Sequence, residues 1–372
     1  MLQILLKKKP YLIASFFVAT LGFAQTTNNG CCPPKPCCPE MPKMTLCPAY
    51  SAPAAIELLC NWDAWVDASF IYWQPSGENL ELGIADHNTG SDDDSHLSPV
   101  TPLVGNVVNM HFGFKPGFQV GVGINFGCDD WDGYAEYTYL RGTDTVSSSG
   151  FTPGQIHSFW ISPAILLDES ATNFSNGSAK WRTAFDFVDA TAGRWYYSGK
   201  RLTFHPFFGF RAAFIRQRYS TAFISDGDLT TTFDKTHSWG IGPRTGVDGN
   251  WMVGCGFRFF GNAAADILYT RYNIKSQQTG VDIDVGVTEI DVSQHNLGYL
   301  RPHVDLETGI GWETYLDCNK WHLDFSAGYG FQVFFDQIMF RKWLDDIDIA
   351  KSIAPMGSLF IQGLTVKARV DF

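Results

Sequence analysis

Histidine and carboxylate side chains alternate along two neighbouring segments near the C-terminus. His303, Asp305 and Glu307 lie two residues apart, and His322 and Asp324 repeat this spacing. A histidine flanked by carboxylates can serve as a general base. The same side chains can instead line a wet lumen and pair with cations on neighbouring strands, which are Arg211, Arg244, Arg301, Lys367 and Arg369. We favour the lumen, because no serine lies in the sharp strand-to-helix turn that exposes a hydrolase nucleophile. We therefore expect no catalytic residue and no enzyme.

A spacing of two residues puts side chains on one face of a β-strand, because successive side chains point to opposite faces. From Leu300 to Trp312, apolar residues occupy one face, interrupted only by Thr308, while polar residues and glycine occupy the other. The segment Trp321–Phe335 repeats this pattern. Both runs exceed the roughly five or six residues of an average globular strand. They reach the roughly 9–11 residues that a tilted strand needs to cross a bilayer.

Further segments alternate in a similar way, so the sequence predicts about ten strands. These segments are Trp62–Trp73, Gly117–Gly127, Trp131–Arg141, Ala179–Tyr197, Leu202–Tyr219, His237–Val247, Ala263–Tyr272 and Leu364–Phe372. Strand-like pieces at Leu80–Ile84 and Val281–Val292 would raise the count to about twelve or more. The alternation breaks midway through Ala179–Tyr197, which indicates a β-bulge.

The connections between these segments alternate in length. Compact links are expected at 127–130, 198–200 and 315–320, and long polar loops at 74–112, 142–178, 220–236, 275–295 and 337–356. Short periplasmic turns alternating with long outer loops are typical of an outer-membrane barrel. The segment Gly249–Gly261 is too long for a tight turn, so it is predicted to form a small interfacial excursion.

The final segment is apolar on one face, formed by Leu364, Val366, Ala368, Val370 and Phe372. Such a strand cannot leave its edge unpaired in lipid, because unpaired backbone groups are costly there. It must therefore pair with the first strand, and its terminal Phe resembles the signal that barrel-insertion machinery recognises. We expect an all-β protein, a transmembrane antiparallel up-and-down β-barrel of about 10–12 strands with long outer loops and short periplasmic turns.

Aromatic residues gather at both ends of the predicted strands. One group is Trp62, Trp131, Trp195, Tyr196, Tyr197, Trp312 and Trp321, and the other is Trp73, Trp181, Trp239 and Trp343. Because amphipathic rings settle at headgroup depth, two aromatic belts are expected of a barrel. The general preference of aromatic residues for strands would also place them in these runs.

Residues 1–24 have the features of a secretory signal peptide. A basic region at 7–9 precedes an apolar stretch at 11–23, and Gly22 and Ala24 are the small residues of a cleavage site. We therefore expect a Cys- and Pro-rich periplasmic arm at 25–60 and an outer-membrane barrel at 61–372. The net charge of −11 argues against nucleic acid as a partner, because phosphate binding needs clustered Lys and Arg.

Four stretches carry a resemblance to a known family. They are Tyr196–Arg211 with its PFFGFR sequence, Trp239–Arg244, Leu300–Pro302 with Trp312–Tyr315, and Gln362–Phe372 with its QGLT sequence. Together they resemble the Legionella-type major outer-membrane protein family of pore-forming β-barrels. The resemblance covers residues 60–372, implies a porin in the cell outer membrane, and offers no catalytic residues. The Cys-rich segment before residue 60 departs from Legionella members and fits a chlamydia-like bacterium better.

All nine cysteines are predicted to lie on the periplasmic side, where thiols tend to form disulfides. The disulfide candidates are Cys31, Cys32, Cys37, Cys38, Cys47, Cys60, Cys128, Cys255 and Cys318. An odd total leaves at least one for a partner or free. We interpret the arm as a tether that is disulfide-linked to envelope proteins, which resembles the envelopes of chlamydia-like bacteria. Internal disulfides that pin the arm under the barrel are an equally open alternative. A metal site is disfavoured, because standard zinc-ligand spacing is missing.

The predicted function is a porin that forms a water-filled channel for passive diffusion of small solutes. It needs no cofactor, and its expected partners are outer-membrane lipid, the barrel-insertion machinery, disulfide-linked envelope proteins and the solutes themselves. The alternative is a structural or adhesive surface barrel with a closed or narrow lumen. A barrel of about ten strands leaves this alternative open, because its own side chains can largely fill it.

Overall fold

The computed structural model describes most of the chain after residue 50. The described residues are 51–56, 58–59, 62–86, 105–126, 131–149, 155–162, 165, 174–225, 228–282, 286–343 and 352–372. Their regular elements are all β-strands. No helix within these ranges is long and apolar enough to cross a membrane. The predicted signal peptide at 1–24 and most of the predicted arm at 25–60 lie outside the described residues.

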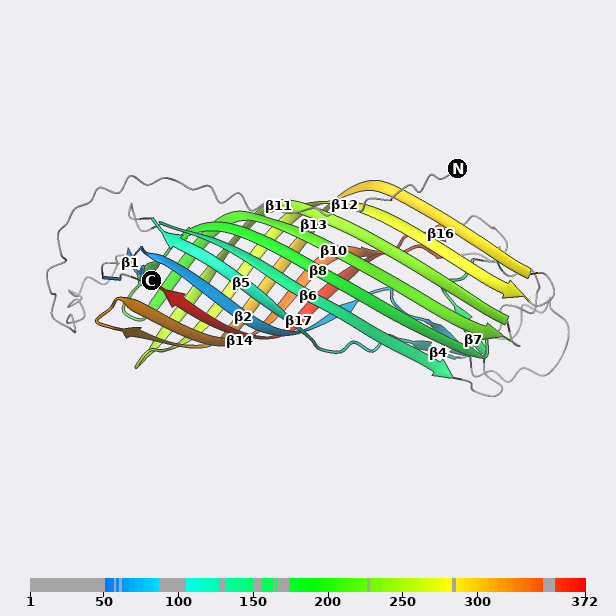
Figure 1. The fold of residues 1–372 in the computed structure, drawn as a ribbon, viewed down its shortest axis with the longest axis horizontal. Coiled ribbons are helices and arrows are strands. Elements are labelled where there is room, and N and C mark those ends of the chain that lie inside the picture. The colour runs from blue at the N-terminus through cyan, green and yellow to red at the C-terminus, as the bar shows by residue number, and fades with distance from the viewer. Residues whose placement is uncertain are drawn as a thin grey trace, which may run out of the picture. The chain divides into compact units, whose positions relative to one another are not determined.

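Ten strands form a closed ring in which neighbouring strands are antiparallel (Figure 1). In ring order they are β2 (Ala64–Gly77), β5 (Lys115–Asn125), β6 (Trp131–Ser149), β8 (Asn176–Arg194), β10 (Leu202–Ser225), β11 (Asp228–Gly254), β12 (Phe257–Asp282), β13 (Gly286–Leu316), β14 (Trp321–Met339) and β17 (Met356–Asp371). The ring closes because β17 pairs with β2, from Leu359 opposite Gly77 to Asp371 opposite Trp65. The predicted antiparallel barrel and the pairing of its last strand with its first are confirmed.

Seven shorter strands in the described ranges accompany the ring. β1 (Ser51–Pro53) and β9 (Tyr196–Ser198) pair with each other, and β9 also pairs with the start of β10. A separate three-stranded sheet consists of β3 (Gly83–Asp86), β4 (Gly105–Val108) and β7 (Gln155–Ser158), and a two-stranded one consists of β15 (Lys342–Trp343) and β16 (Ser352–Ile353). The predicted strand-like piece at Leu80–Ile84 therefore adds no strand to the ring.

At one end of the ring, which we call the turn end, every connection between successive ring strands is short, whereas the opposite end has both long and short connections. Between β11 and β12 only Cys255 and Gly256 intervene, with φ angles of 53° and 80°. Positive φ at both positions is what the commonest two-residue hairpin turn requires. The predicted excursion at Gly249–Gly261 is therefore wrong. Trp251 and Phe257 continue the outward apolar pattern of their strands right up to this turn.

At the opposite end, which we call the loop end, the strands are longer than predicted. β10 continues to Ser225, and β11 begins at Asp228, so the loop predicted at 220–236 is mostly strand. The loop predicted at 275–295 is likewise mostly strand, because β12 runs to Asp282 and β13 begins at Gly286. Both faces of these extensions carry polar residues. The alternation of apolar and polar residues that predicts a strand is therefore weak in these segments.

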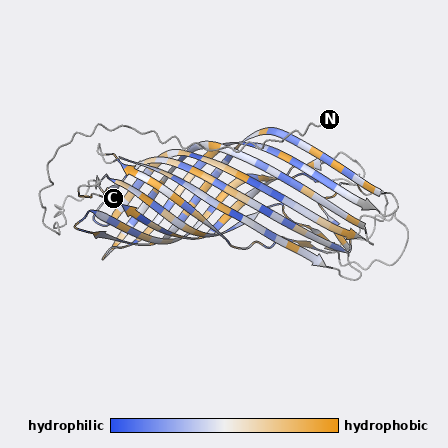
Figure 2. Cartoon of the chain, viewed as in Figure 1, coloured by the Kyte–Doolittle hydropathy of each residue, from blue (hydrophilic) through white to orange (hydrophobic). Residues whose placement is uncertain are grey.

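An apolar belt covers the outward face of the ring, and polar and apolar positions alternate along its strands (Figure 2). Its exposed side chains include Val66, Phe70, Val120, Val122, Val188, Phe208, Phe210, Ile241, Val247, Ile267, Leu306, Ile310, Phe325, Leu364 and Val366. Such a band is the lipid-facing surface of an outer-membrane barrel. Trp131, Trp312 and Trp321 are exposed at its turn-end edge and Trp239 at its loop-end edge. Trp73 and Trp181, predicted for the second belt, are instead 4% and 0% exposed inside the ring.

The apolar face changes sides along a single strand. Near the turn end of β8, Val188 is exposed and Asp189 is buried, whereas near the loop end Arg182 is exposed and Trp181 is buried. β8 keeps an unbroken register with both β6 and β10 throughout. The bulge predicted within Ala179–Tyr197 is therefore wrong. The break in the alternation records a change in the surroundings of the strand and not a shift in its pairing.

The apolar core lies inside the ring, toward the loop end. It contains fully buried side chains from the ring, among them Trp181, Phe185, Phe187, Tyr219, Phe223 and Phe334. Segments outside the ring strands complete it with Leu80, Leu82, Trp160, Ile161 and Phe340. The Trp160 ring packs on the Tyr219 ring with their centroids 4.3 Å apart. We call this cluster the apolar plug, because it fills the interior of the barrel at this level.

Candidate functional site

A charged chamber occupies the barrel interior between the turn end and the apolar plug. It is partly open, with a volume of about 360 Å³. Tyr197, Asn250 and Tyr315 border it near the turn end, and Trp73 and Phe187 border it where the plug begins. Every ring strand contributes inward side chains to its wall. The chamber exists because each membrane-level strand points its polar positions away from lipid.

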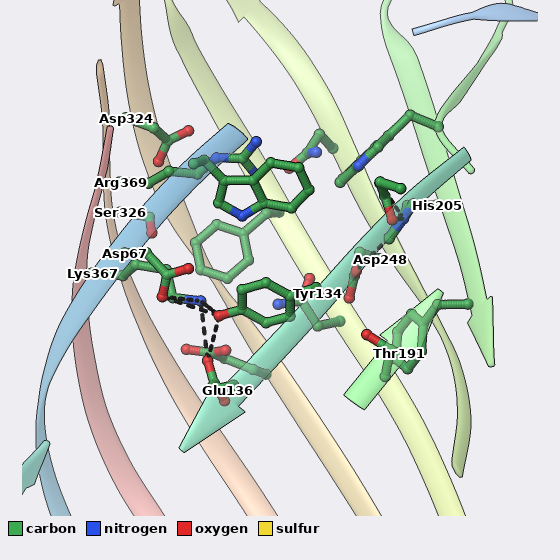
Figure 3. A pocket seen from close by; sticks show the side chains of 18 of the residues that line it. Asp67, Tyr134, Glu136, Thr191, His205, Asp248, Asp324, Ser326, Lys367 and Arg369 are labelled. Carbon is green, nitrogen blue, oxygen red and sulfur yellow. Dashed lines mark hydrogen bonds and ion pairs between the residues drawn. The ribbon is translucent and has the colours of Figure 1, made fainter. Parts of the chain in front are cut away.

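One wall of the chamber holds a lysine among acidic groups, which point toward one another in Figure 3. Lys367 Nζ lies 3.4 Å from Asp67 Oδ2 and 3.4 Å from Glu136 Oε2. The Tyr134 hydroxyl lies 3.0 Å from the same Asp67 oxygen and 2.8 Å from the same Glu136 oxygen. These four side chains come from β17, β2 and β6, so the cluster also joins the first strand to the last.

The facing wall holds two arginines in a carboxylate network. Arg211 Nε and Nη2 donate to the two Asp189 oxygens, each at 2.6 Å. Arg244 donates to Asp266 Oδ2 and to Asp305 Oδ2, both at 2.9 Å. Both arginines are buried, and bidentate pairing of this kind is the geometry in which buried guanidinium groups are best satisfied. The network ties β8, β10, β11, β12 and β13 together across the interior.

Near the turn end, His205 lies between two carboxylates, and Figure 3 shows it meeting Asp248 across neighbouring strands. Its Nε2 is 2.9 Å from Asp132 and its Nδ1 is 3.0 Å from Asp248. The imidazole stacks on the Trp195 ring at a centroid distance of 4.4 Å. Both ring nitrogens are therefore already engaged, which leaves this histidine fixed in the wall.

Arg258 forms the corresponding cationic group on the other side of the turn end. Its guanidinium is 2.5 Å from Asp324 Oδ2 and 3.0 Å from Glu313 Oε2. Arg369 pairs with Asp371 on its own strand and lies over the Trp65 ring at 4.2 Å. The chamber wall thus carries charges of both signs from one end to the other.

Seven of the ten residues predicted to line a lumen border the chamber. They are Arg211, Arg244, Asp305, Glu307, Asp324, Lys367 and Arg369. His303 and His322 are each 1% exposed and lie within the wall. Arg301 lies closer to the loop end, where its Nε donates to the Tyr272 hydroxyl at 3.0 Å and its guanidinium stacks on Tyr299. It lies against a separate buried cluster that contains Tyr272 and Met339, and it does not border the chamber.

Several chamber residues were not predicted from the sequence. They are Asp67, Tyr134, Glu136, Asp189, His205, Asp248 and Arg258. What these residues share is their place in the alternation. Each lies at an inward-facing position of a segment whose outward-facing positions are mostly apolar. Asp67 lies between Val66 and Ala68, for example, and Glu136 lies between Ala135 and Tyr137. A single carboxylate in such a run draws less attention than the repeated pattern at 303–307.

The histidine–carboxylate pairs resemble half of a hydrolytic site. His303 Nδ1 is 2.8 Å from Asp266 Oδ2, and His322 Nδ1 is 2.8 Å from Asp371 Oδ2. A nucleophilic mechanism also needs a hydroxyl or thiol within hydrogen-bond reach of the base. Among the described residues, no hydrogen bond joins either histidine to Ser, Thr or Cys. No three His, Cys, Asp or Glu side chains in these ranges are arranged to hold a metal ion.

The plug is anchored over the chamber by polar contacts as well as by packing. The Trp160 indole donates to the Glu81 carbonyl at 2.7 Å, and the Tyr219 hydroxyl donates to the Leu80 carbonyl at 2.9 Å. On the side of the plug that faces the chamber, the Phe187 and Phe334 rings stack with their centroids 5.3 Å apart. The charged chamber therefore ends against packed apolar side chains at this level.

Only two of the nine predicted disulfide candidates lie among the described residues. Cys255 is an exposed free thiol in the turn between β11 and β12. Cys318 lies in the turn between β13 and β14, where the Leu59 N–H donates to the neighbouring Asn319 carbonyl at 2.9 Å. The other seven lie outside the described residues, so disulfide connectivity stays a prediction.

Comparison with known proteins gives one family and several structures of the same general kind. A profile of the family described as Legionella pneumophila major outer membrane protein precursor matches residues 58–371. No curated protein matches the chain. The outer membrane protease OmpT from Escherichia coli is 9% identical, with 83% of this chain and 96% of that chain covered and a TM-score of 0.36. A Pseudomonas aeruginosa FadL homologue is 7% identical, with 83% and 89% covered and a TM-score of 0.25. Neither likeness is strong enough to bear on function.

Proposed function

Because the chain belongs to the Legionella pneumophila major outer membrane protein family, and so is an outer-membrane β-barrel protein, we propose that it is a porin with a narrow lumen. The family and the outer-membrane location were both predicted from the sequence and are confirmed. The proposed porin passes small hydrophilic solutes passively. The observation that carries this proposal is the charged chamber, which reaches from the turn end to the plug and is lined from every ring strand.

The chamber chemistry suits small polar solutes of either charge. Lys367, Arg258 and Arg244 each lie among carboxylates, so the wall presents short alternations of positive and negative groups. Rings of one charge sign would exclude one class of ion, whereas an alternating wall selects weakly. The turn end faces the periplasm by the usual arrangement of such barrels, in which the short turns are periplasmic.

The apolar plug limits passage and is the proposed gate. Trp160 and Phe340 come from segments outside the ring, so they can leave the lumen without breaking any ring pairing. Their departure would extend the chamber toward the loop end. Substitutions of lumen residues in an outer-membrane barrel avoid the loss of stability that charged residues on the lipid-facing surface cause. Substitutions in the plug can therefore alter passage through the lumen while the ring stays folded.

A surface barrel with a permanently closed lumen is the second candidate function. The specific observation in its favour is the plug itself, in which Trp160, Tyr219 and Phe223 are 0% exposed. In that case the ring anchors the loop-end segments outside the cell, and the chamber has no solute to carry. We also propose that the chain is not an enzyme, because each histidine in the chamber wall is engaged by a carboxylate and none is hydrogen-bonded to a Ser, Thr or Cys within the described part of the chain.

Planar-bilayer conductance of the refolded full chain distinguishes the two candidates. We expect small, discrete current steps from the native sequence and larger or more frequent steps from Trp160→Ala, because the substitution removes a tryptophan that enters the gate from outside the ring. Trp239→Ala is the matched control, since it removes an exposed indole from the outward face. Absence of current steps from both the native protein and Trp160→Ala would reject the porin and leave the closed surface barrel.

We further propose that the periplasmic side is disulfide-linked to envelope proteins. The exposed thiol of Cys255 supports this, because a turn-end thiol is accessible to a partner in an oxidising compartment. Non-reducing electrophoresis of freshly alkylated envelopes tests it. A single monomeric band would reject the link and favour internal disulfides.

A further inference from the structure

Four cations lie side by side on the outward face of four adjacent strands. The register places Arg182 of β8 opposite Arg218 of β10, Arg218 opposite Lys235 of β11, and Lys235 opposite Lys275 of β12. The alternate positions, such as Gln217 on β10, are buried inside the ring, so the four cations are on the outer surface. Strands lie about 4.8 Å apart, which gives the row a width of about 14 Å.

More cations surround this row. Arg216 lies opposite His237, two residues closer to the turn end, and Arg271 lies opposite Trp239. We call Arg182, Arg216, Arg218, Lys235 and Lys275 together the basic patch. Its concentration of positive charge is notable in a chain whose net charge is −11.

Protein carboxylates neutralise only part of the basic patch. Arg216 pairs with Asp186 at 2.8 Å, and Lys275 pairs with Asp291 at 3.0 Å. Arg182, Arg218 and Lys235 have no ion pair with any residue that the structure describes. Like charges directly opposite one another on a sheet are destabilising. Three unpaired cations in one row therefore call for an anion from outside the protein.

The pKa of the neighbouring His237 is affected by the same positive charges. His237 lies beyond the apolar belt, outside the membrane-spanning part of β11. Its pKa is lowered from 6.5 first by burial and then by the charges of Lys235, Arg216 and Arg218. The charges that lower this pKa would equally attract an anionic group.

The position of the basic patch identifies the anion. Phe214 and Trp239, which form the loop-end edge of the apolar belt, lie opposite each other immediately toward the turn end from Arg216 and His237. A lipid whose acyl chains lie on the belt therefore places its headgroup against the basic patch. The loop end faces outward from the cell, because the short turns of such barrels are periplasmic. The anion is thus presented by the outer leaflet.

We propose that the basic patch binds the phosphate groups of a phosphorylated glycolipid in the outer leaflet. Arginine suits this role, because its planar fork binds phosphate through two parallel hydrogen bonds. Lys235 adds a point charge beside Arg218, and Lys275 adds another beside Lys235. The width of the row accommodates a headgroup with two phosphates, and the acyl chains of the same molecule cover the belt below.

A binding experiment on the refolded full chain tests the proposal. The probes are lipid A with two phosphates, dephosphorylated lipid A, and inorganic phosphate, each added to the protein in neutral detergent. We expect the native protein to retain lipid A with two phosphates and the double variant Arg218→Gln/Lys235→Gln to bind it about tenfold more weakly, since each basic residue at a lipid surface contributes to headgroup affinity. Arg218→Lys/Lys235→Arg, which keeps both charges, is expected to bind like the native protein.

The matched control is Lys200→Gln/Arg201→Gln, which removes the same two charges from an exposed turn at the turn end. It is expected to bind lipid A like the native protein. Native-strength binding by Arg218→Gln/Lys235→Gln, or equal binding of dephosphorylated lipid A, would overturn the proposal. Displacement of lipid A by a similar concentration of inorganic phosphate would also overturn it, because it would indicate a simple anion site.

Discussion

In the half of the barrel near the turn end, apolar side chains face outward and charged side chains face inward, whereas in the half near the loop end β8 and β10 reverse both faces. β8 contains both arrangements. Val188 is exposed and Asp189 is buried in the first half, while Arg182 faces outward and Trp181 inward in the second. The same strand, in one continuous register with β10, thus obeys two opposite polarity rules. The medium outside the ring, lipid or water, decides which rule applies.

The difference teaches where each half obtains its stability. Lipid is as apolar as a leucine side chain, so the outward belt gains little from a hydrophobic drive against it. That half is held together inside by ion pairs such as Arg211–Asp189 and by its complete ring of backbone hydrogen bonds. The loop-end half is surrounded by water, and it gains stability by burying Trp160, Trp181 and Phe223 as a soluble protein does.

The largest effect that tests this comparison is expected from a truncation in the plug. Trp181 is 0% exposed, so Trp181→Ala should lower the free energy of unfolding by about 3–5 kcal/mol, as a cavity in a packed core does. Denaturant unfolding in detergent measures it. Trp62→Ala is the control, because Trp62 is 85% exposed and its loss should cost less than about 0.5 kcal/mol. Equal small losses from both variants would mean that the plug contributes no core.

A somewhat smaller effect is expected when a charge is placed on the outward face at two heights of one strand. Ile267 lies in the belt on β12 and is 54% exposed, so Ile267→Arg should cost about 2–4 kcal/mol in a bilayer, as lipid-facing arginines near the midplane do. Thr279 shares the outward face of β12 beyond the belt. Thr279→Arg should change stability by less than about 0.5 kcal/mol. Folding into lipid vesicles measures both, and equal costs would erase the boundary between the halves.

The sequence predicted the half near the turn end well, because apolar and polar residues alternate there with little interruption. In Leu300–Trp312 the outward positions are apolar except Thr308, and the inward ones are polar or glycine, so the strand, its inward face and the residues Asp305 and Glu307 could all be predicted. Closure of the ring followed from the final segment alone, since an apolar strand edge cannot stay unpaired in lipid. The same reasoning missed Asp67, whose strand carries a single inward carboxylate in that stretch.

The sequence could not reveal the loop-end half in the same way. The sequence predicts Trp73 and Trp181 in an aromatic belt, because amphipathic rings at strand ends settle at headgroup depth, but both side chains are buried inside the ring. Above the belt the apolar residues of β8 face inward, and the resulting break in the alternation of Ala179–Tyr197 resembles a bulge. The plug also depends on Trp160 and Phe340, which meet across 180 residues of chain, and period-two patterns carry no information about such contacts.

The smallest expected effect is a change in ion selectivity. It compares the loss of a charge inside the turn-end half with the loss of a charge on the outer surface of the loop-end half. Lys367 offsets one of the two negative charges of Asp67 and Glu136 in the chamber, so Lys367→Gln makes this wall more negative and should shift ion selectivity toward cations by about twofold. Reversal potentials across a salt gradient measure the shift, in the Trp160→Ala background that we expect to conduct. Lys235→Gln removes the same charge from the outward face of the loop-end half, and it should leave the reversal potential unchanged. If both variants shift selectivity equally, the current does not pass through the chamber, and the inward face of the membrane half is only a structural filling.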